Sequence, residues 1–258
     1  GHPARRDLVA GDFFYEEDLL SEVVEPRRYN FVHPFGVPVR YHDLQQIAEA
    51  CPLDLLEIHL SYKDLDVNLH QFFNEPLPHK LVVHSPELFS GDHVLDLCTE
   101  NAAYRERSIK ELQRVIAITN ELKEYFPSTD RPPIVLNAGG FSADHFISPQ
   151  ARQEKYNLLL DSLSRIDQTG IELIPQTMPP FPWHFGGQRY HNLFVRADEI
   201  LAFCQQNGYR VCLDVSHSKL ACTHENESLL RFVEKIAPVT AHLHIADARG
   251  VDGEGLQI

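Results

Sequence analysis

The feature that most constrains this chain is the alternation of short apolar segments with amphipathic helical segments along its length. Alternation of this kind predicts a parallel sheet, and continuous apolar strands such as residues 81–83 suit a sheet that is buried on both faces. We predict seven strands, over residues 37–41, 55–60, 80–84, 134–137, 171–175, 211–214 and 241–245. Apolar spacing predicts helices over residues 43–50, 103–125, 153–169, 197–207 and 227–236.

Strand–helix units repeated over 258 residues predict an α/β fold of the (β/α)8 TIM-barrel type. The barrel domain is expected over residues 31–258, and it lacks a visible eighth strand. Residues 1–30 do not follow the alternation and are interpreted as a linker or as the edge of a preceding domain. We therefore expect this chain to be a module of a longer protein.

Composition excludes several classes of protein. A hydrophobic content of 43% indicates a globular chain, and no apolar run reaches the roughly 20 residues of a membrane helix. The formal net charge of −14 argues against a nucleic-acid partner, because such proteins usually present a basic surface. Five cysteines without a CxxC pair favour reduced thiols and a cytoplasmic location.

Polar side chains follow the apolar part of most predicted strands. The carboxyl ends of the strands in a parallel barrel converge on one mouth, so we expect these side chains to lie close together. Imidazoles and carboxylates gathered there are typical ligands of Zn²⁺ and Mn²⁺. In strand order, these residues are Glu57 and His59, His84 and Glu87, Asn137, Gln176, Asp214 and His217, and finally His242, His244 and Asp247.

A single histidine beside a strand is more often a hydrogen-bonded structural residue than a ligand. Barrel packing does not require a polar end on strand after strand, however. This repetition favours a functional interpretation for Asp214, His217 and His244. We expect only one of His242 and His244 to face the barrel interior, and we choose His244.

The segment after the fifth strand, residues 175–188, contains four prolines and two glycines around the only Trp. Such a stiff loop, poor in backbone donors, is either a rigid cover over the barrel mouth or a wall that faces the substrate. In the second case Trp183 and Phe181 would stack on an apolar sugar face. His184, Gln188 and Arg189 would then reach polar groups.

The turn after the fourth strand, residues 137–140, could offer backbone amides to a phosphate or a carboxylate. Asn137 from this turn is added to the residues that are expected to bind substrate at the barrel mouth. The residues expected to bind substrate are His59, Asn137, Gln176, Trp183, His184, Gln188 and Arg189.

The order of these motifs resembles the xylose isomerase-like barrel superfamily, which includes sugar-phosphate isomerases and epimerases and the endonuclease IV enzymes. The resemblance covers about residues 37–250 and rests on EIHLS, VVHSPE, LDVSH and HLHIAD. It implies that Asp214, His217 and His244 are ligands of a divalent metal (Zn²⁺, Mn²⁺ or Mg²⁺) or its close neighbours, and that His84 faces the site.

The chain departs from the family pattern at two positions. The fifth strand usually ends in a Glu ligand, where this chain has Gln176, and an amide is a poorer ligand for a hard cation. The last acidic ligand, on the eighth strand, would lie beyond Ile258. Both departures imply weakened metal affinity, and a barrel that kept its shape but lost its chemistry stays open as an alternative.

A narrower similarity lies in PQTMPPFPWHFGGQRYHNLF and HLHIADARGVDGEGLQI, which are similar to the barrel module attached to some proteins of the N-acetylneuraminate synthase family. The stretch ARRDLVAGDFFYEEDL is similar to the antifreeze-like domain found after such synthases. This similarity implies a role in nonulosonic-acid biosynthesis, with a covalently linked synthase domain as partner.

The leading hypothesis is therefore a sugar or sugar-phosphate isomerase or epimerase. Glu57, His84 and Glu87 are the candidates for moving the proton, and a bound metal would polarise an oxygen of the substrate. The first alternative is a non-catalytic sugar-binding module of a multidomain synthase, which Gln176 favours. The second is an endonuclease IV-like phosphodiesterase, against which the acidic charge and Asn137 both weigh.

Overall fold

The computed structural model describes residues 32–182 and 189–256, and the compact unit that contains the sheet spans Phe35–Ile258. All seven predicted strands are present, and their bounds differ from the prediction by at most two residues. They run parallel in chain order. The parallel strands are β1 (Gly36–Val39), β2 (Leu55–His59), β3 (Lys80–His84), β6 (Pro133–Leu136), β8 (Glu172–Pro175), β10 (Val211–Asp214) and β11 (Thr240–His244).

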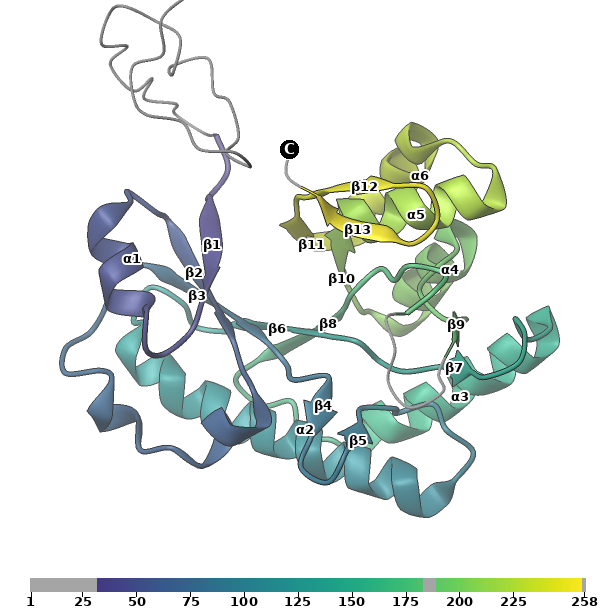
Figure 1. Cartoon of the computed structure of the whole chain (residues 1–258). Coiled ribbons are helices and arrows are strands. Elements are labelled where there is room, and N and C mark those ends of the chain that lie inside the picture. The colour runs from purple at the N-terminus through teal and green to yellow at the C-terminus, as the bar shows by residue number, and fades with distance from the viewer. Residues whose placement is uncertain (1–31, 183–188, 257–258) are drawn as a thin grey trace, which may run out of the picture. The chain divides into compact units, whose positions relative to one another are not determined.

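The first five of these strands form one sheet, and β10 pairs with β11 in a second ladder. A parallel bridge between Gln176 and Cys212 connects the two ladders, so the order of strands continues from β8 to β10. Within the described residues, no eighth parallel strand pairs with β11 or with the free side of β1. The parallel sheet and its helices define the α/β barrel class (Figure 1).

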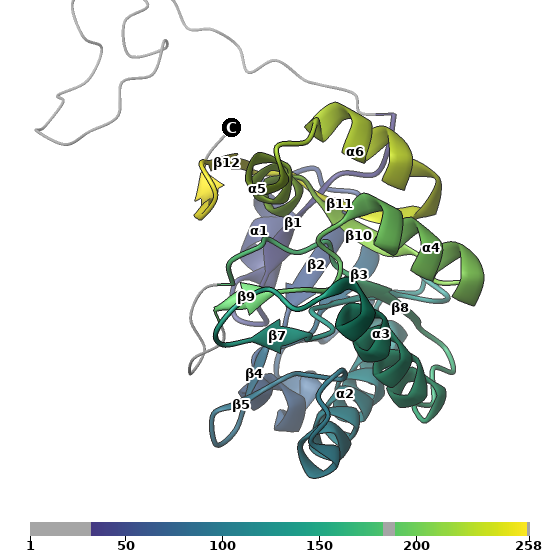
Figure 2. The ribbon, with the colours of Figure 1, turned by 90° about the vertical axis from the view of Figure 1, so that its right-hand side faces the viewer.

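Helices follow most of the parallel strands, and α2 and α3 run side by side (Figures 1 and 2). Four of them begin at side-chain caps, from Asn101, Ser148, Asp214 and Ser228. The third helix starts four residues earlier than predicted, because Ser148 caps it and Pro149 fits its first turn. The helices are α1 (Leu44–Ala50), α2 (Ala102–Leu122), α3 (Pro149–Ser164), α4 (Ala197–Asn207), α5 (Val215–Glu225) and α6 (Leu229–Ile236).

Helix α5 is absent from the sequence prediction. Asp214, expected only as a ligand, caps this helix, and its side chain accepts the backbone N–H of His217. The strand thus passes into the helix without a loop, so no turn signal separates the two. A short hairpin, β12–β13, packs on α5 (Figure 1).

The remaining elements are short connections. They are the strands β4 (Leu88–Phe89), β5 (His93–Val94), β7 (Phe141–Ser142), β9 (Tyr190–His191), β12 (Asp247–Arg249) and β13 (Gly253–Leu256), and the 3-10 helices η2 (Tyr62–Asp66), η3 (Leu69–Gln71), η4 (Lys123–Tyr125) and η5 (Ala237–Val239). All five cysteines are free. No helix in the described part of the chain has the length and hydropathy that crossing a bilayer requires.

Apolar residues of the barrel form two separate clusters. The larger lies between the strands and the helices, and it includes outward-facing residues such as Leu56 and Ile58 of β2. The smaller fills the barrel interior with one residue from each of several strands, because alternate residues of a strand face opposite sides. Its members are Val82, Val135, Ile174 and Cys212, with the partly buried Leu55 and Ala241.

The interior layer fixes the position of the polar strand ends. Residues two further along each strand face the same side, so the next layer toward the mouth holds Glu57, His84, Asn137, Gln176 and Asp214. The polar residues predicted at successive strand ends are therefore one layer of the barrel, directly above an apolar floor.

A β-bulge changes the facing of β11. Val211 pairs with Thr240, whereas the next residue, Cys212, pairs with His242, so Ala241 is the extra residue. The shift brings His242 and His244 opposite Cys212 and Asp214, which face the interior. Without this bulge both histidines would face outward.

Candidate functional site

Glu57 on β2 is the centre of the polar layer. Its side chain is 6% exposed and receives three histidines. Nε2 of His59 lies 2.8 Å from Oε1, Nε2 of His242 lies 2.7 Å from Oε2, and Nε2 of His244 lies 3.0 Å from both oxygens. One buried carboxylate thus connects β2 with β11 across the mouth of the barrel.

His84 on β3 completes this group of imidazoles. Its ring stacks on that of His59 with a centroid separation of 4.6 Å, and on that of His244 at 5.8 Å. The Nδ1 of His84 lies 2.9 Å from the carbonyl oxygen of Ser85, and a carbonyl only accepts, so Nδ1 carries a hydrogen. In the neutral ring the lone pair is therefore on Nε2, which lies 3.1 Å from Oε1 of Gln176.

Asp214 on β10 is held mainly by its own helix. Oδ1 accepts hydrogen bonds from Ser216 Oγ at 2.7 Å and from the backbone N–H of His217 at 2.9 Å. Oδ2 accepts the amide of Gln176 at 3.1 Å and lies 3.4 Å from Nδ1 of His244. His217 in turn donates from Nδ1 to the carbonyl oxygen of Thr177 at 2.8 Å.

The surroundings of the two carboxylates in this layer, Glu57 and Asp214, lower the pKa of both. Burial tends to raise the pKa of Glu57, but hydrogen bonds from His242, His244 and His59 outweigh it and hold that pKa well below its usual value. Burial also acts to raise the pKa of Asp214, but hydrogen bonding from His244 and the charge of His217 lower it to about 2. Both carboxylates are therefore ionised at neutral pH.

The pKa values of the two stacked histidines, His84 and His244, are shifted in opposite directions. Burial tends to lower the pKa of His244, but hydrogen bonds to Asp214, Cys212 and Glu57 raise it far above its ordinary value. Burial, followed by the neighbouring charge of His59, lowers the pKa of His84 to about 4. An imidazolium and a neutral imidazole consequently stand side by side at neutral pH.

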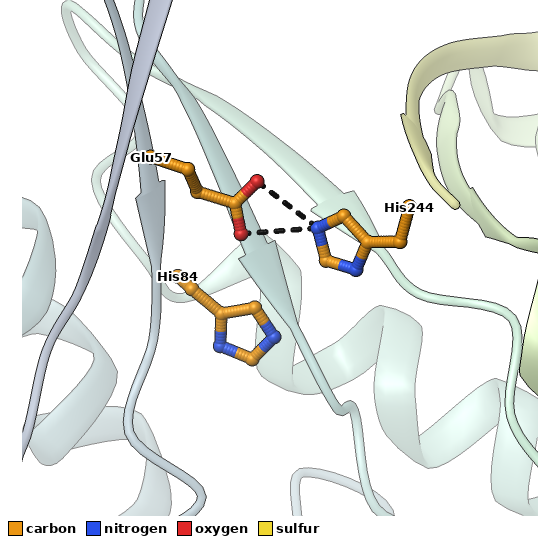
Figure 3. A group of neighbouring side chains, drawn as sticks. All are labelled: Glu57, His84 and His244. Atoms are coloured by element: carbon orange, nitrogen blue, oxygen red, sulfur yellow. Dashed lines mark hydrogen bonds and ion pairs between the residues drawn. The ribbon is translucent and has the colours of Figure 1, made fainter. Parts of the chain in front are cut away.

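Glu57, His84 and His244 form a group that could hold a metal ion, because one ligand atom from each lies within 4.8 Å of the others (Figure 3). The sequence-predicted set shares only His244 with this group. The amide N–H of Gln176 points at Asp214, and His217 is 3.8 Å from that carboxylate. A metal at either carboxylate would have to displace such hydrogen bonds, and among the described residues the group with ligand atoms close enough to share an ion is Glu57, His84 and His244.

The other sequence-predicted residues lie around or outside this layer. Glu87 is half-buried between β3 and β4, and the Arg189 side chain is exposed beside β9. The side-chain oxygen of Asn137 accepts the N–H of Gly139, while Gly140 donates to Asp96, so these amides are not directed at a ligand. Trp183, His184 and Gln188 lie outside the described residues.

The glycines of this turn are required by close packing. Gly139 and Gly140 have φ of 90° and 93°, in the left-handed region. A Cβ on Gly139 would lie 2.2 Å from Oδ1 of Asp96. The turn after β6 therefore serves the backbone rather than a phosphate.

The expectation that only one of His242 and His244 faces the interior is wrong. Residues two apart on a strand share a face, and both rings bind Glu57. That spacing was the available signal. A second residue that sequence reasoning missed is His191 on β9, which is fully buried and carries no distinguishing motif.

The fold and the sequence together place this chain in a known family. It belongs to the xylose isomerase-like TIM barrel family, whose model matches residues 46–257. No curated protein matches it closely.

Solved structures share the fold at low sequence identity. A D-tagatose 3-epimerase-like protein is 21% identical and has a TM-score of 0.57, over 85% of this chain and 78% of that one. A xylose isomerase domain protein from Planctomyces limnophilus is 13% identical and has a TM-score of 0.54, over 87% and 80%. An L-ribulose 3-epimerase is 15% identical and has a TM-score of 0.53, over 81% and 69%. At these identities the likeness establishes the fold.

Proposed function

We propose that this protein is an isomerase or epimerase of a sugar or sugar phosphate. The observation that carries the proposal is the Glu57 carboxylate, bonded to three imidazoles at the mouth of a barrel of this family. The names of two fold relatives, a D-tagatose 3-epimerase-like protein and an L-ribulose 3-epimerase, support this substrate class.

Such a reaction removes a proton from a carbon beside a carbonyl group and returns one to the same or the adjacent carbon. His84 is suited to be the base, because Nδ1 holds the hydrogen and the lone pair of the neutral ring is left on Nε2. After it takes a proton, Nε2 can donate to Oε1 of Gln176 at 3.1 Å. The amide thereby supports the protonated state of the base.

His244 is suited to be the acid. It lies between Glu57 and Asp214, and two carboxylates hold it in the imidazolium form. A cation at this position stabilises negative charge on an enediolate oxygen and can deliver a proton to it. A base and an acid with opposite ring states are therefore available within one stacked pair.

A divalent metal is the cofactor that Glu57, His84 and His244 could hold. Two imidazole nitrogens and one carboxylate oxygen suit Zn²⁺ or Mn²⁺ better than Mg²⁺, which prefers oxygen ligands. When bound, such an ion supplies Lewis-acid polarisation of a carbonyl oxygen. Without a bound metal, Glu57, His84 and His244 would act in the roles described above.

Exchange of carbon-bound hydrogen with solvent tests this proposal. L-ribulose, D-tagatose and D-ribulose 5-phosphate are incubated with the protein in D₂O, with EDTA or with Mn²⁺ or Zn²⁺, and followed by proton NMR. We expect loss of one C–H signal with at least one sugar, and loss of this activity in His84→Phe. No exchange with any sugar under any metal condition would contradict the proposal.

A second candidate is a sugar-binding module without catalysis, and the Gln176 amide favours it, because it replaces a carboxylate with a neutral group bonded to Asp214. Calorimetry separates the two. Sugar binding without solvent exchange, retained in His84→Phe, would select the binding module.

A finer proposal places the chain in nonulosonic-acid biosynthesis, linked to a synthase domain. It is supported by the similarity of residues 175–194 and 242–258 to a barrel module of such proteins, and of residues 4–19 to the antifreeze-like domain that follows such synthases. Binding of N-acetylated amino sugars in preference to the neutral ketoses, measured by the same calorimetry, is the expected result. Equal or weaker binding would remove this assignment and leave the isomerase proposal unaffected.

A further inference from the structure

Arg40 lies at the barrel mouth beside the polar layer, and the site described above does not use it. Val39, the last residue of β1, pairs with Ile58 of β2, so Arg40 stands level with His59 at the carboxyl ends of the two strands. Nη1 of Arg40 donates to the carbonyl oxygen of His59 at 2.6 Å, and the ring of the same histidine bonds Glu57 at 2.8 Å. One residue therefore connects the guanidinium with the central carboxylate.

The guanidinium side of this connection is open to solvent. Arg40 is an exposed residue, and the side chain of His59 is 31% exposed, whereas that of Glu57 is 6% exposed. Exposure thus increases from the carboxylate outward to the arginine. A ligand from solution can reach the guanidinium and the His59 ring without a rearrangement of the main chain.

Two hydrogen bonds hold Arg40 in position. Besides the bond from Nη1, its backbone N–H donates to Oδ1 of Asp43 at 2.6 Å, in the turn that leads into α1. An arginine that is already fixed loses less conformational entropy when it binds a ligand than one that moves freely. Arg40 is therefore a prepared binding group rather than a mobile surface side chain.

The charge of Arg40 is not balanced by the bond that holds it. A carbonyl oxygen takes up one N–H donor of the guanidinium and leaves the other donors and the positive charge. Within the described ranges the Arg40 guanidinium forms no ion pair with a carboxylate. Arg210 shows the contrast, because its guanidinium donates to both oxygens of Glu172, at 2.7 and 2.6 Å.

A purely structural role for Arg40 would be to cap a backbone carbonyl at a strand end. Arg131 has that role at the opposite end of the barrel, where Nη2 donates to the carbonyl oxygen of Ile171, just before β8, at 3.0 Å. The two arginines make the same kind of bond. They differ in location, because Arg40 alone of the pair stands beside the polar layer, and Arg131 is therefore a matched control.

The chemistry of the guanidinium identifies the class of ligand. Its planar N–H groups match the paired oxygens of a phosphate or a carboxylate. The other cation of the mouth, the imidazolium of His244, is already enclosed by Glu57 and Asp214. An anionic group of a ligand would be repelled by these two carboxylates and attracted to Arg40 at the rim.

We infer that Arg40 binds a terminal oxyanion of the sugar, either a phosphate or a carboxylate, while the reacting carbons lie against His84 and His244. This inference rests on the proposed function and narrows its substrate class from sugars in general to sugar phosphates or sugar acids. Arg40 contributes binding and specificity, and it takes no part in the proton transfer.

Calorimetry with three ketohexoses that differ only at C6 tests the inference. D-tagatose carries a hydroxyl group there, D-tagatose 6-phosphate a phosphate, and D-tagaturonate a carboxylate. We expect the wild type to bind at least one charged sugar about tenfold more tightly than D-tagatose. Arg40→Gln should abolish this preference, and Arg40→Lys should keep part of it, because lysine keeps the charge but not the planar donors. The charged sugar that is preferred identifies the oxyanion.

Arg131→Gln separates recognition of the anion from loss of a carbonyl cap. Both Gln variants lose such a cap, so we expect similar small decreases in the urea midpoint of unfolding. Only Arg40→Gln should lose the preference for the charged sugar. Equal affinity of the wild type for all three sugars, or a preference that persists in Arg40→Gln, would overturn the inference.

Hydrogen exchange in D₂O with the same three sugars distinguishes failure of this inference from failure of the proposed function. A preference for a charged sugar that depends on Arg40, with no exchange of any sugar, would support the oxyanion site and remove the isomerase. Exchange of D-tagatose, with no gain from a charge at C6 in wild type over Arg40→Gln, would overturn the oxyanion site and leave the isomerase standing.

Discussion

The two sides of the barrel mouth use similar residues in different ways. On the side of β2, β3 and β11, four imidazoles surround one carboxylate, and most of the hydrogen bonds join side chain to side chain. On the side of β8 and β10, Asp214, Thr177 and His217 are bound to backbone groups, at a helix cap and in a turn.

Under the proposed function, this difference favours the side of β2, β3 and β11 as the place of the chemistry. A side chain that is bonded to the backbone keeps its position and has few free valences for a substrate. A cluster of imidazoles around a carboxylate can pass protons without moving the main chain. Under this proposal the second side serves mainly to hold Gln176 and His244 in place, whereas the family resemblance implies a metal at Asp214, His217 and His244.

Removing the central charge should have the largest effect. In Glu57→Gln the three histidines lose their anionic partner, so His244 is no longer held between two carboxylates. We expect kcat/KM for sugar exchange to fall about 10²- to 10⁴-fold. Glu49→Gln, on the exposed face of α1, is the control and should be unchanged. A loss smaller than tenfold in Glu57→Gln would move the chemistry away from β2.

Two substitutions of Asp214 separate support from charge. Asp214→Ala loses the cap of α5 and the acceptor of Ser216, so the free energy of unfolding should fall by about 2–3 kcal/mol. Asp214→Asn keeps a capping oxygen and should lose less than half as much. Urea unfolding measures both variants. Equal losses would mean that charge, rather than the cap, dominates at this position.

Acid should destabilise the protein through His191. Burial, and then the charge of His217, lower its pKa to about 3 in the folded protein, against 6.5 ordinarily. Between pH 3 and pH 6.5 the unfolded chain therefore binds a proton at His191 that the folded protein does not bind. The contribution of His191 to the free energy of unfolding is complete above pH 6.5 and is lost as the pH falls toward 3. The slope is at most about 1.4 kcal/mol per pH unit for this group.

His191→Phe should remove that part of the slope, as measured by urea unfolding at pH 7 and pH 4.5. The contribution of His84, whose pKa is also lowered, stays in both proteins. An unchanged slope in the variant would show that His191 is not kept neutral by the fold.

The smallest expected effect concerns Gln176. In Gln176→Glu a second carboxylate would stand about 3 Å from Asp214, where the amide now donates at 3.1 Å. Without metal we expect destabilisation of about 1 kcal/mol, or about 2–4 °C in Tm. Mn²⁺ or Zn²⁺ should raise the Tm of the variant more than that of the wild type. Gln45→Glu on α1 controls for added charge, and equal metal responses would argue that position 176 does not face a cation.

Much of the fold could be predicted from the sequence because the strands are continuous apolar runs with polar ends. Residues 80–84 and 211–214 were predicted with the observed bounds. Helix α5 could not be predicted, because Asp214 ends the strand and caps the helix at once. The short antiparallel pairs, such as β7 with β9, depend on contacts between distant segments that no local pattern reveals.

The residues of the candidate site could be predicted from the sequence, but the hydrogen bonds between them could not. The polar strand ends identify Glu57, His84 and His244, because two-residue periodicity lifts them above the apolar layer. Which carboxylate receives the histidines depends on the bulge at Ala241 and on the direction of the Gln176 amide. Those are decided by packing and hydrogen-bond competition across strands, which single-sequence reasoning does not resolve.

Strand β11 carries two histidines of the site, yet it is paired on one side and has an exposed apolar side chain. Among the described residues it pairs with β10 only, and Leu243 on the strand and Ile245 just after it are 50% and 63% exposed. Amide protons on such a strand exchange with solvent through local opening, whereas those of β3, paired on both sides, require larger unfolding. The site therefore has one half in protected structure and one half in a strand that opens more easily. Any ligand that bridges Glu57 to His242 and His244 should slow the exchange of β11 amide protons with solvent. Amide hydrogen exchange in β11 therefore reports whether a ligand occupies the barrel mouth.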